Sequence, residues 1–79
     1  MKIVIKNIWW DNNIGWGYEF KATTTINGYE VNFTGRVTAG YITSVELNVK
    51  NEITLKEFEK LKEKAQEKLE EIKQILKVK

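Results

Sequence analysis

The chain has 79 residues, with 13 basic and 11 acidic side chains and a formal net charge of +2. It contains no cysteine and no histidine, which excludes disulfides, thiolate–zinc sites, imidazole ligands and nucleophiles that depend on histidine. The length allows one domain, residues 1–79. Because there is no signal-peptide pattern and no membrane-spanning apolar run, we expect a soluble cytoplasmic protein without cofactors.

Residues 2–10 form the first predicted strand, but their apolar positions change parity partway along it. Ile3 and Ile5 share one parity, whereas Ile8 and Trp10 share the other. A bulge near Lys6 and Asn7 would bring all four onto one face. We expect one of the adjacent Trp9 and Trp10 to point away from the core in either case.

The next two strands form the clearest hairpin. Apolar residues alternate from Trp16 to Ile26, Asn27-Gly28 is a strong hairpin turn, and alternation resumes at Tyr29. The resulting register places Glu19 opposite Arg36, Thr23 opposite Asn32, Phe20 over Gly35 and Ala22 beside Phe33.

For the third turn we predict a three-residue loop, Thr38-Ala39-Gly40, with Gly40 as a bulge residue. This loop pairs Val37 with Tyr41 and Phe33 with Val45, and it keeps the alternating fourth-strand residues on the apolar face. A two-residue loop would turn that strand over.

A long amphipathic helix is predicted over residues 54–77. Thr54 and Glu57 have the spacing of a capping box, and Leu55, Phe58, Leu61, Ala65, Leu69, Ile72 and Leu76 recur at helical spacing. We therefore expect an α+β fold, in which a four-stranded antiparallel meander (about residues 2–50) is followed by one helix packed on one face. One helix is narrower than four strands, so the sheet curls or an apolar strip stays open.

No arrangement of side chains in the sequence points to catalysis. Outside the helix the carboxylates are Asp11, Glu19, Glu30, Glu46 and Glu52, and cross-strand pairs such as Glu19 with Arg36 explain the strand residues better than an acid–base dyad. The Asp11-Asn12-Asn13 run has too few carboxylates for a tight calcium loop and is typical of Asx turns. We predict that the protein is not an enzyme.

The predicted function is protein interaction, with a homodimer through the uncovered face or an edge strand as one form. The unusual segment around the first turn is the expected contact site: Trp9, Trp10, Asp11, Asn12, Asn13 and Trp16. The Lys, Ile and Asn bias is typical of AT-rich mobile elements. From it we hypothesise a phage inhibitor of the anti-CRISPR kind, which blocks a host nucleic-acid enzyme sterically.

Two alternatives remain open. Four strands followed by a helix starting at Ile53-Thr54-Leu55 resemble the layout of PC4-like single-strand-binding domains, which implies a nucleic-acid partner. The candidate contacts for it are Lys6, Lys21, Arg36 and Lys50, together with Lys2 and one of Trp9 and Trp10. The agreement between caps, turns and pattern is also typical of a de novo designed scaffold, although seven asparagines and the Trp9–Asn13 segment argue against one.

Overall fold

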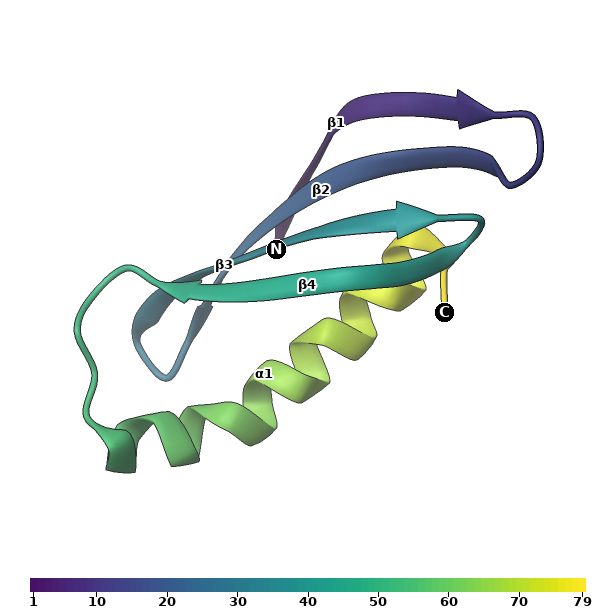
Figure 1. Ribbon diagram of the computed structural model, residues 1–79. Coiled ribbons are helices and arrows are strands. Elements are labelled where there is room, and N and C mark those ends of the chain that lie inside the picture. Colours follow the sequence, from purple (N-terminus) through teal and green to yellow (C-terminus); the bar gives the residue numbers. More distant parts are fainter.

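Four antiparallel strands pair with their neighbours in sequence and are followed by one helix, as predicted (Figure 1). The computed structural model describes all residues 1–79. The strands are β1 (Lys2–Asp11), β2 (Gly15–Ile26), β3 (Tyr29–Thr38) and β4 (Tyr41–Val49), and the helix is α1 (Leu55–Leu76). The fold is elongated, with extents of 45 × 19 × 19 Å.

The central hairpin, β2–β3, has the register predicted from the alternation. Phe20 lies opposite Gly35 and Ala22 opposite Phe33. The turn between the strands places Asn27 and Gly28 at positive φ, 52° and 83°, as a two-residue hairpin loop requires. On the polar face the Thr23 hydroxyl donates a hydrogen bond of 3.1 Å to Asn32 Oδ1.

The β3–β4 turn differs from the prediction. It is a two-residue loop in which Ala39 and Gly40 both have positive φ, 54° and 81°, and Thr38 pairs with Tyr41. The predicted three-residue loop is therefore wrong. Two-residue loops of this kind are favoured because their twist matches that of the flanking strands.

A bulge in β4 restores the facing that the short loop would otherwise reverse. Val37 pairs with Ile42 but Arg36 pairs with Ser44, which leaves Thr43 as the extra residue. Ile42 therefore takes the inward position that was predicted for Tyr41, and Tyr41 is 54% exposed. Beyond the bulge the register is displaced from the prediction, with the pairs Gly35–Val45, Phe33–Leu47 and Val31–Val49.

The predicted bulge in β1 is present. Lys6 pairs with Glu19 and Trp9 with Gly17, so Asn7 and Ile8 share a single position on β2. Asn7 has a φ of 52°, a left-handed conformation that asparagine tolerates better than most residues. Trp10 then pairs with Trp16, on the face of Ile3 and Ile5, and alternation from Trp9 places Ile8 on that face as well.

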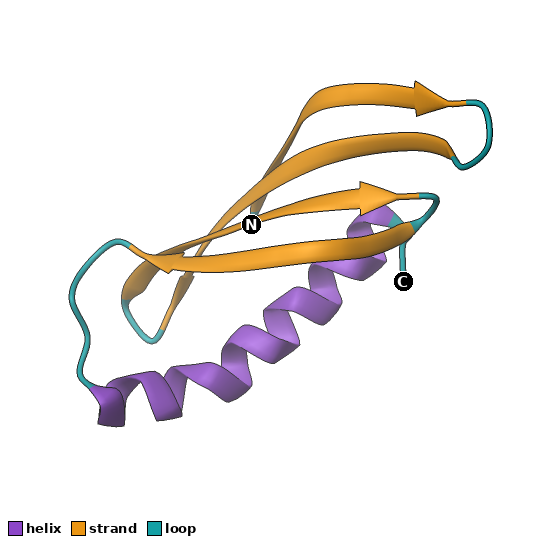
Figure 2. Ribbon diagram, in the orientation of Figure 1, coloured by secondary structure: helices purple, strands orange, loops and turns teal.

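The helix begins at the predicted capping box and packs along one face of the sheet (Figure 2). Thr54 Oγ1 accepts a hydrogen bond from the Glu57 backbone N–H, and Glu57 Oε1 accepts one from the Thr54 backbone N–H. Buried helix and sheet residues form a single core: Phe20, Ala22, Ile26, Val31, Phe33, Val37, Leu61, Ala65 and Ile72.

The end of the chain returns to the sheet, which the sequence did not suggest. Lys77 adopts the left-handed conformation that ends many helices, with a φ of 57°. The Lys79 N–H then donates to Gly40 O, and the Ile42 N–H donates to Lys79 O, both at 2.9 Å. This pair of hydrogen bonds joins residue 79 to the β3–β4 turn.

The helix does not cover the whole sheet. Every sheet residue in the buried core comes from β2 or β3, and none comes from the edge strands β1 and β4. Three residues of β4 pack partly buried against this core, but only Ile3 of β1 does so. In Figure 1 the distal parts of β1 and β2 rise away from the helix. Of the two outcomes expected from the width of the helix, an open apolar strip is therefore present, and it runs along β1. The structure contains no helix with the length and apolar character needed to cross a membrane.

Candidate functional site

Two exposed tryptophans face each other at the far end of the β1–β2 hairpin. Trp10 and Trp16 pair across the strands, with ring centroids 4.9 Å apart and planes at 67°. This is an edge-to-face arrangement, and the residues are still 56% and 62% exposed. We call Trp10 and Trp16 the tryptophan pair. Large aromatic residues left open to solvent in this way are typical of contact surfaces.

The loop between the two tryptophans is held by its own side chains. Asp11 Oδ1 accepts hydrogen bonds from the backbone N–H groups of Asn13 (2.8 Å) and Ile14 (3.2 Å), which is an Asx turn. The Trp10 indole N–H donates to Asn12 Oδ1 at 3.1 Å. Five of the six predicted contact residues, Trp10 to Asn13 and Trp16, are therefore brought together in one ordered loop.

Trp9, the sixth predicted residue, lies on the opposite face. It pairs with Gly17, and a Cβ atom at Gly17 would overlap the Trp9 indole. The Arg36 guanidinium carbon lies 4.8 Å from the centroid of the indole ring, a cation–π contact. Trp9 is thus packed between a strand backbone and an arginine, whereas the tryptophan pair is open.

Further apolar side chains are exposed near the tryptophan pair. Ile5 and Ile8 share this face of β1 and are exposed. On the helix, Leu69 and Ile75 lie on opposite flanks of buried Ile72, since they precede and follow it by three residues.

Leu69 lines a groove against β4 together with Phe58, Val45 and Leu47, which fixes that flank on the β4 side. The other flank, which carries the exposed Ile75, is turned away from that groove. We call Ile5, Ile8, Trp10 and Trp16 the open face.

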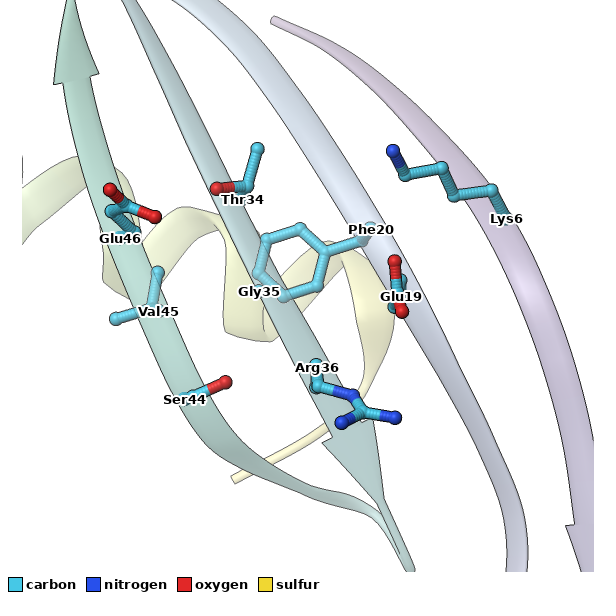
Figure 3. Close-up of a pocket in the computed structure, with 9 residues that line it drawn as sticks. All are labelled: Lys6, Glu19, Phe20, Thr34, Gly35, Arg36, Ser44, Val45 and Glu46. Carbon is cyan, nitrogen blue, oxygen red and sulfur yellow. The ribbon is translucent and has the colours of Figure 1, made fainter.

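The polar face of the sheet has a shallow depression of about 350 Å³ (Figure 3). Side chains from all four strands surround it: Lys6, Glu19, Phe20, Thr34, Gly35, Arg36, Ser44, Val45 and Glu46. It mixes both charges and is open to solvent, unlike the partly desolvated pocket in which carboxylates act as acid and base. No group of three or more acidic side chains gathers anywhere in the structure.

The expected pair of Glu19 and Arg36 is opposite in register but forms no ion pair. Glu19 Oε2 instead accepts a hydrogen bond of 3.0 Å from Asn7 Nδ2, and Arg36 lies over Trp9. The bulge that presents Asn7 to Glu19 and the indole that attracts Arg36 explain the difference.

Two of the four residues considered for nucleic-acid contact already have partners, although Lys6 and Arg36 line the same depression. Lys50 is ion-paired with Glu30 at 3.0 Å, and Arg36 is stacked on Trp9. Lys6 and Lys21 are both on the polar face near the free edge of β1. By the register, Lys2 lies on the same face and at the same edge.

No protein-family model, curated protein or solved structure matches this chain.

Proposed function

We propose that this chain is a non-catalytic protein-interaction module and that the tryptophan pair is the centre of its binding surface. The observation that carries the proposal is the exposure of two adjacent indoles, with Ile8 beside them, on a sheet face that the helix leaves open. Tryptophan is among the residues that contribute most to protein–protein binding when it is buried by a partner.

The order of the loop supports the same proposal. Asp11 and Asn12 fix the turn and the Trp10 indole through side-chain hydrogen bonds before any partner is bound. A surface that is already ordered loses less conformational entropy on binding, so more of the contact energy remains as affinity.

The mode of action we propose is steric. The hairpin tip projects beyond the helix (Figure 2), and a projecting aromatic tip fits a groove on a larger protein. In its specific form the proposal is a phage-type inhibitor, anti-CRISPR-like, that occludes a host nucleic-acid enzyme. The support for that specific form is the composition of the chain and its lack of catalytic groups.

Nucleic-acid binding of the PC4-like kind is the second candidate, favoured by Lys2, Lys6 and Lys21. These lysines lie on the polar face, whereas the tryptophan pair lies on the apolar one. A single strand cannot stack on the pair and neutralise its phosphates on these lysines in the same place, which weakens this candidate.

The test compares Trp10→Ser and Trp16→Ser with Tyr41→Ser, a matched change at another exposed aromatic residue. We expect a protein captured from nuclease-treated host lysate by the wild type to be captured by Tyr41→Ser but lost with both tryptophan variants, all three folded by circular dichroism. Equal capture by all variants would contradict the proposal. So would tight oligonucleotide binding that weakens steeply with salt.

The predicted homodimer is tested with the same variants. If the open face joins two copies, analytical ultracentrifugation shows a dimer for the wild type and for Tyr41→Ser and a monomer for Trp10→Ser. If the wild type and both variants are all monomeric, the open face does not join two copies, and its proposed partner is a different protein.

A further inference from the structure

The two edges of the sheet differ in how their backbone groups are used. At the β4 edge, Lys79 exchanges two hydrogen bonds with Gly40 and Ile42. At the β1 edge, no backbone hydrogen bond reaches outside the β1–β2 ladder. Every second residue of an edge strand directs its N–H and C=O away from the sheet, so β1 presents free donors and acceptors.

The regular part of this edge is residues 2–6, before the bulge at Asn7. On its polar face Lys2 lies opposite Thr23, Lys6 opposite Glu19, and Val4 opposite Lys21. Lys2, Lys6 and Lys21 therefore surround Val4, which is 46% exposed, and none of the three takes part in an ion pair. The polar side of the edge is thus positively charged without a partner.

The other side of the same edge is apolar. Ile3 is half-buried against the core and Ile5 is exposed. A strand added to this edge would place alternate side chains beside the lysines and the intervening ones beside Ile3 and Ile5.

We infer that the edge of β1 at residues 2–6 binds an extended segment of a partner protein as a fifth strand, in which acidic and apolar residues alternate. The acidic residues lie beside Lys2 and Lys6, with Lys21 one strand further from the edge, and the apolar residues lie beside Ile3 and Ile5. Main-chain hydrogen bonds supply affinity in strand addition, and the alternating side chains supply specificity. This surface is separate from the tryptophan pair, and the inference shares with the proposed function only the requirement for a protein partner.

A second copy of this chain fits the edge poorly. Two copies can pair all of residues 2–6 in only one antiparallel register, in which Val4 faces Val4. In that register Lys2 of each copy faces Lys6 of the other, so two lysine–lysine pairs form. Like charges directly opposite one another are destabilising, and edge lysines are a common protection against self-pairing. The lysines at this edge therefore favour an acidic partner strand over a second copy of this chain.

A nucleic acid would use the lysines but not the rest of the edge. Phosphates give Ile3 and Ile5 no apolar contact, and the Glu19 carboxylate lies opposite Lys6 on the same face. The edge as a whole matches a polypeptide strand better.

The test uses a short fluorescein-labelled peptide of strictly alternating glutamate and valine, followed by fluorescence anisotropy at physiological salt. We expect the combined change Lys2→Glu, Lys6→Glu and Lys21→Glu to weaken binding at least about tenfold. The combined change Lys56→Glu, Lys60→Glu and Lys64→Glu, at exposed helix positions, reverses the same number of charges and is expected to weaken it less than about twofold. Circular dichroism checks that both variants are folded.

Three peptide controls separate strand addition from charge attraction alone. A peptide with its glutamates and valines in two blocks, and an alternating peptide N-methylated at every second residue, are both expected to lose binding. An alternating lysine–valine peptide is expected to bind only the variant reversed at β1. Equal binding of the block or N-methylated peptide overturns the inference, as does a single-stranded oligonucleotide that binds more tightly than the peptide and loses affinity in the same variant.

Failure here is distinguishable from failure of the proposed function. Trp10→Ser is expected to retain peptide binding, because it lies beyond the bulge from residues 2–6. Peptide binding that is lost in Trp10→Ser but kept in the β1 lysine variant would overturn the edge site and leave the tryptophan surface standing.

Discussion

Gly35 lies so close to its neighbours that no larger residue fits at this position. The Phe20 ring lies against it from the neighbouring strand, and a Cβ atom at this position would come within 2.8 Å of the ring and 2.6 Å of the Ser44 carbonyl oxygen. Backbone on one side and a fully buried ring on the other leave no direction in which a methyl group can be accommodated.

We therefore expect Gly35→Ala to lower the free energy of unfolding by about 1–3 kcal/mol, the range for overpacking a core. Urea denaturation measures this, with Ser44→Ala at an exposed neighbouring position as the control, expected within about 0.5 kcal/mol of the wild type. A Gly35→Ala protein as stable as the control would mean that Phe20 moves freely. The contact of Phe20 with Gly35 was predictable from the sequence, since the Asn27-Gly28 turn fixes the register.

Tyr18 gives a pH dependence of stability. Burial raises its pKa above the usual value of 10.0. The unfolded chain therefore loses this proton at a lower pH than the folded chain, so the stabilising contribution is complete below about pH 10 and falls as the pH rises through the folded pKa.

We expect Tyr18→Phe to make the decline in stability above pH 10 shallower than in the wild type. The measurement is the urea midpoint between about pH 8 and pH 11 in both proteins. Identical slopes for the wild type and Tyr18→Phe would show that Tyr18 titrates alike in both states.

At the scale of the elements, the β3–β4 turn carries avoidable backbone strain. Ala39 has a φ of 54°, a conformation that costs an L-residue with a Cβ roughly 1 kcal/mol and that asparagine adopts more readily. The equivalent position of the β2–β3 turn is Asn27.

Ala39→Asn is therefore expected to raise the free energy of unfolding by about 0.5–1 kcal/mol, and the β-branched Ala39→Val to lower it by at least as much. Thermal and urea unfolding measure both changes. If asparagine and valine have the same effect, the turn does not hold residue 39 in the left-handed region.

The same turn explains which parts of the fold the sequence predicts and which it does not. The Asn27-Gly28 turn was predictable because both residues tolerate positive φ, and the β1 bulge because the apolar residues of that strand change parity near Asn7. Alanine has no preference for positive φ, so Ala39 did not mark a two-residue turn. Without the bulge at Thr43, only the longer loop keeps the apolar residues of β4 on one face, and the sequence pattern gave no sign of that bulge. Since the structure uses a short turn and a bulge together, local pattern identified the strand but misplaced its register.

The candidate site divides in the same way. The segment from Trp9 to Trp16 was identifiable by its unusual composition, but the faces of Trp9 and Trp10 depend on the bulge in β1. Lys2, Lys6 and Lys21 were candidates from the sequence, but their position around Val4 at the sheet edge depends on the pairing of β1 with β2.

At the scale of the whole molecule, the last residues connect the helix to the sheet edge. Val78 packs against the core and donates its N–H to Lys73 O at 3.0 Å, and Lys79 exchanges its two hydrogen bonds with the β3–β4 turn. These contacts fix the C-terminal end of α1 to β4 and occupy the edge there, while the β1 edge stays free.

Removing Val78 and Lys79 is therefore expected to lower the free energy of unfolding by about 1–3 kcal/mol, from three backbone hydrogen bonds and one partly buried valine. It should also speed hydrogen exchange at the Ile42 amide, which loses its acceptor, more than at amides in the β2–β3 ladder. Lys79→Ala keeps the backbone and is the control, expected to exchange as the wild type does. If Ile42 exchanges no faster without residues 78–79, the segment does not protect the β4 edge, and the contrast with β1 that makes β1 the docking edge no longer holds.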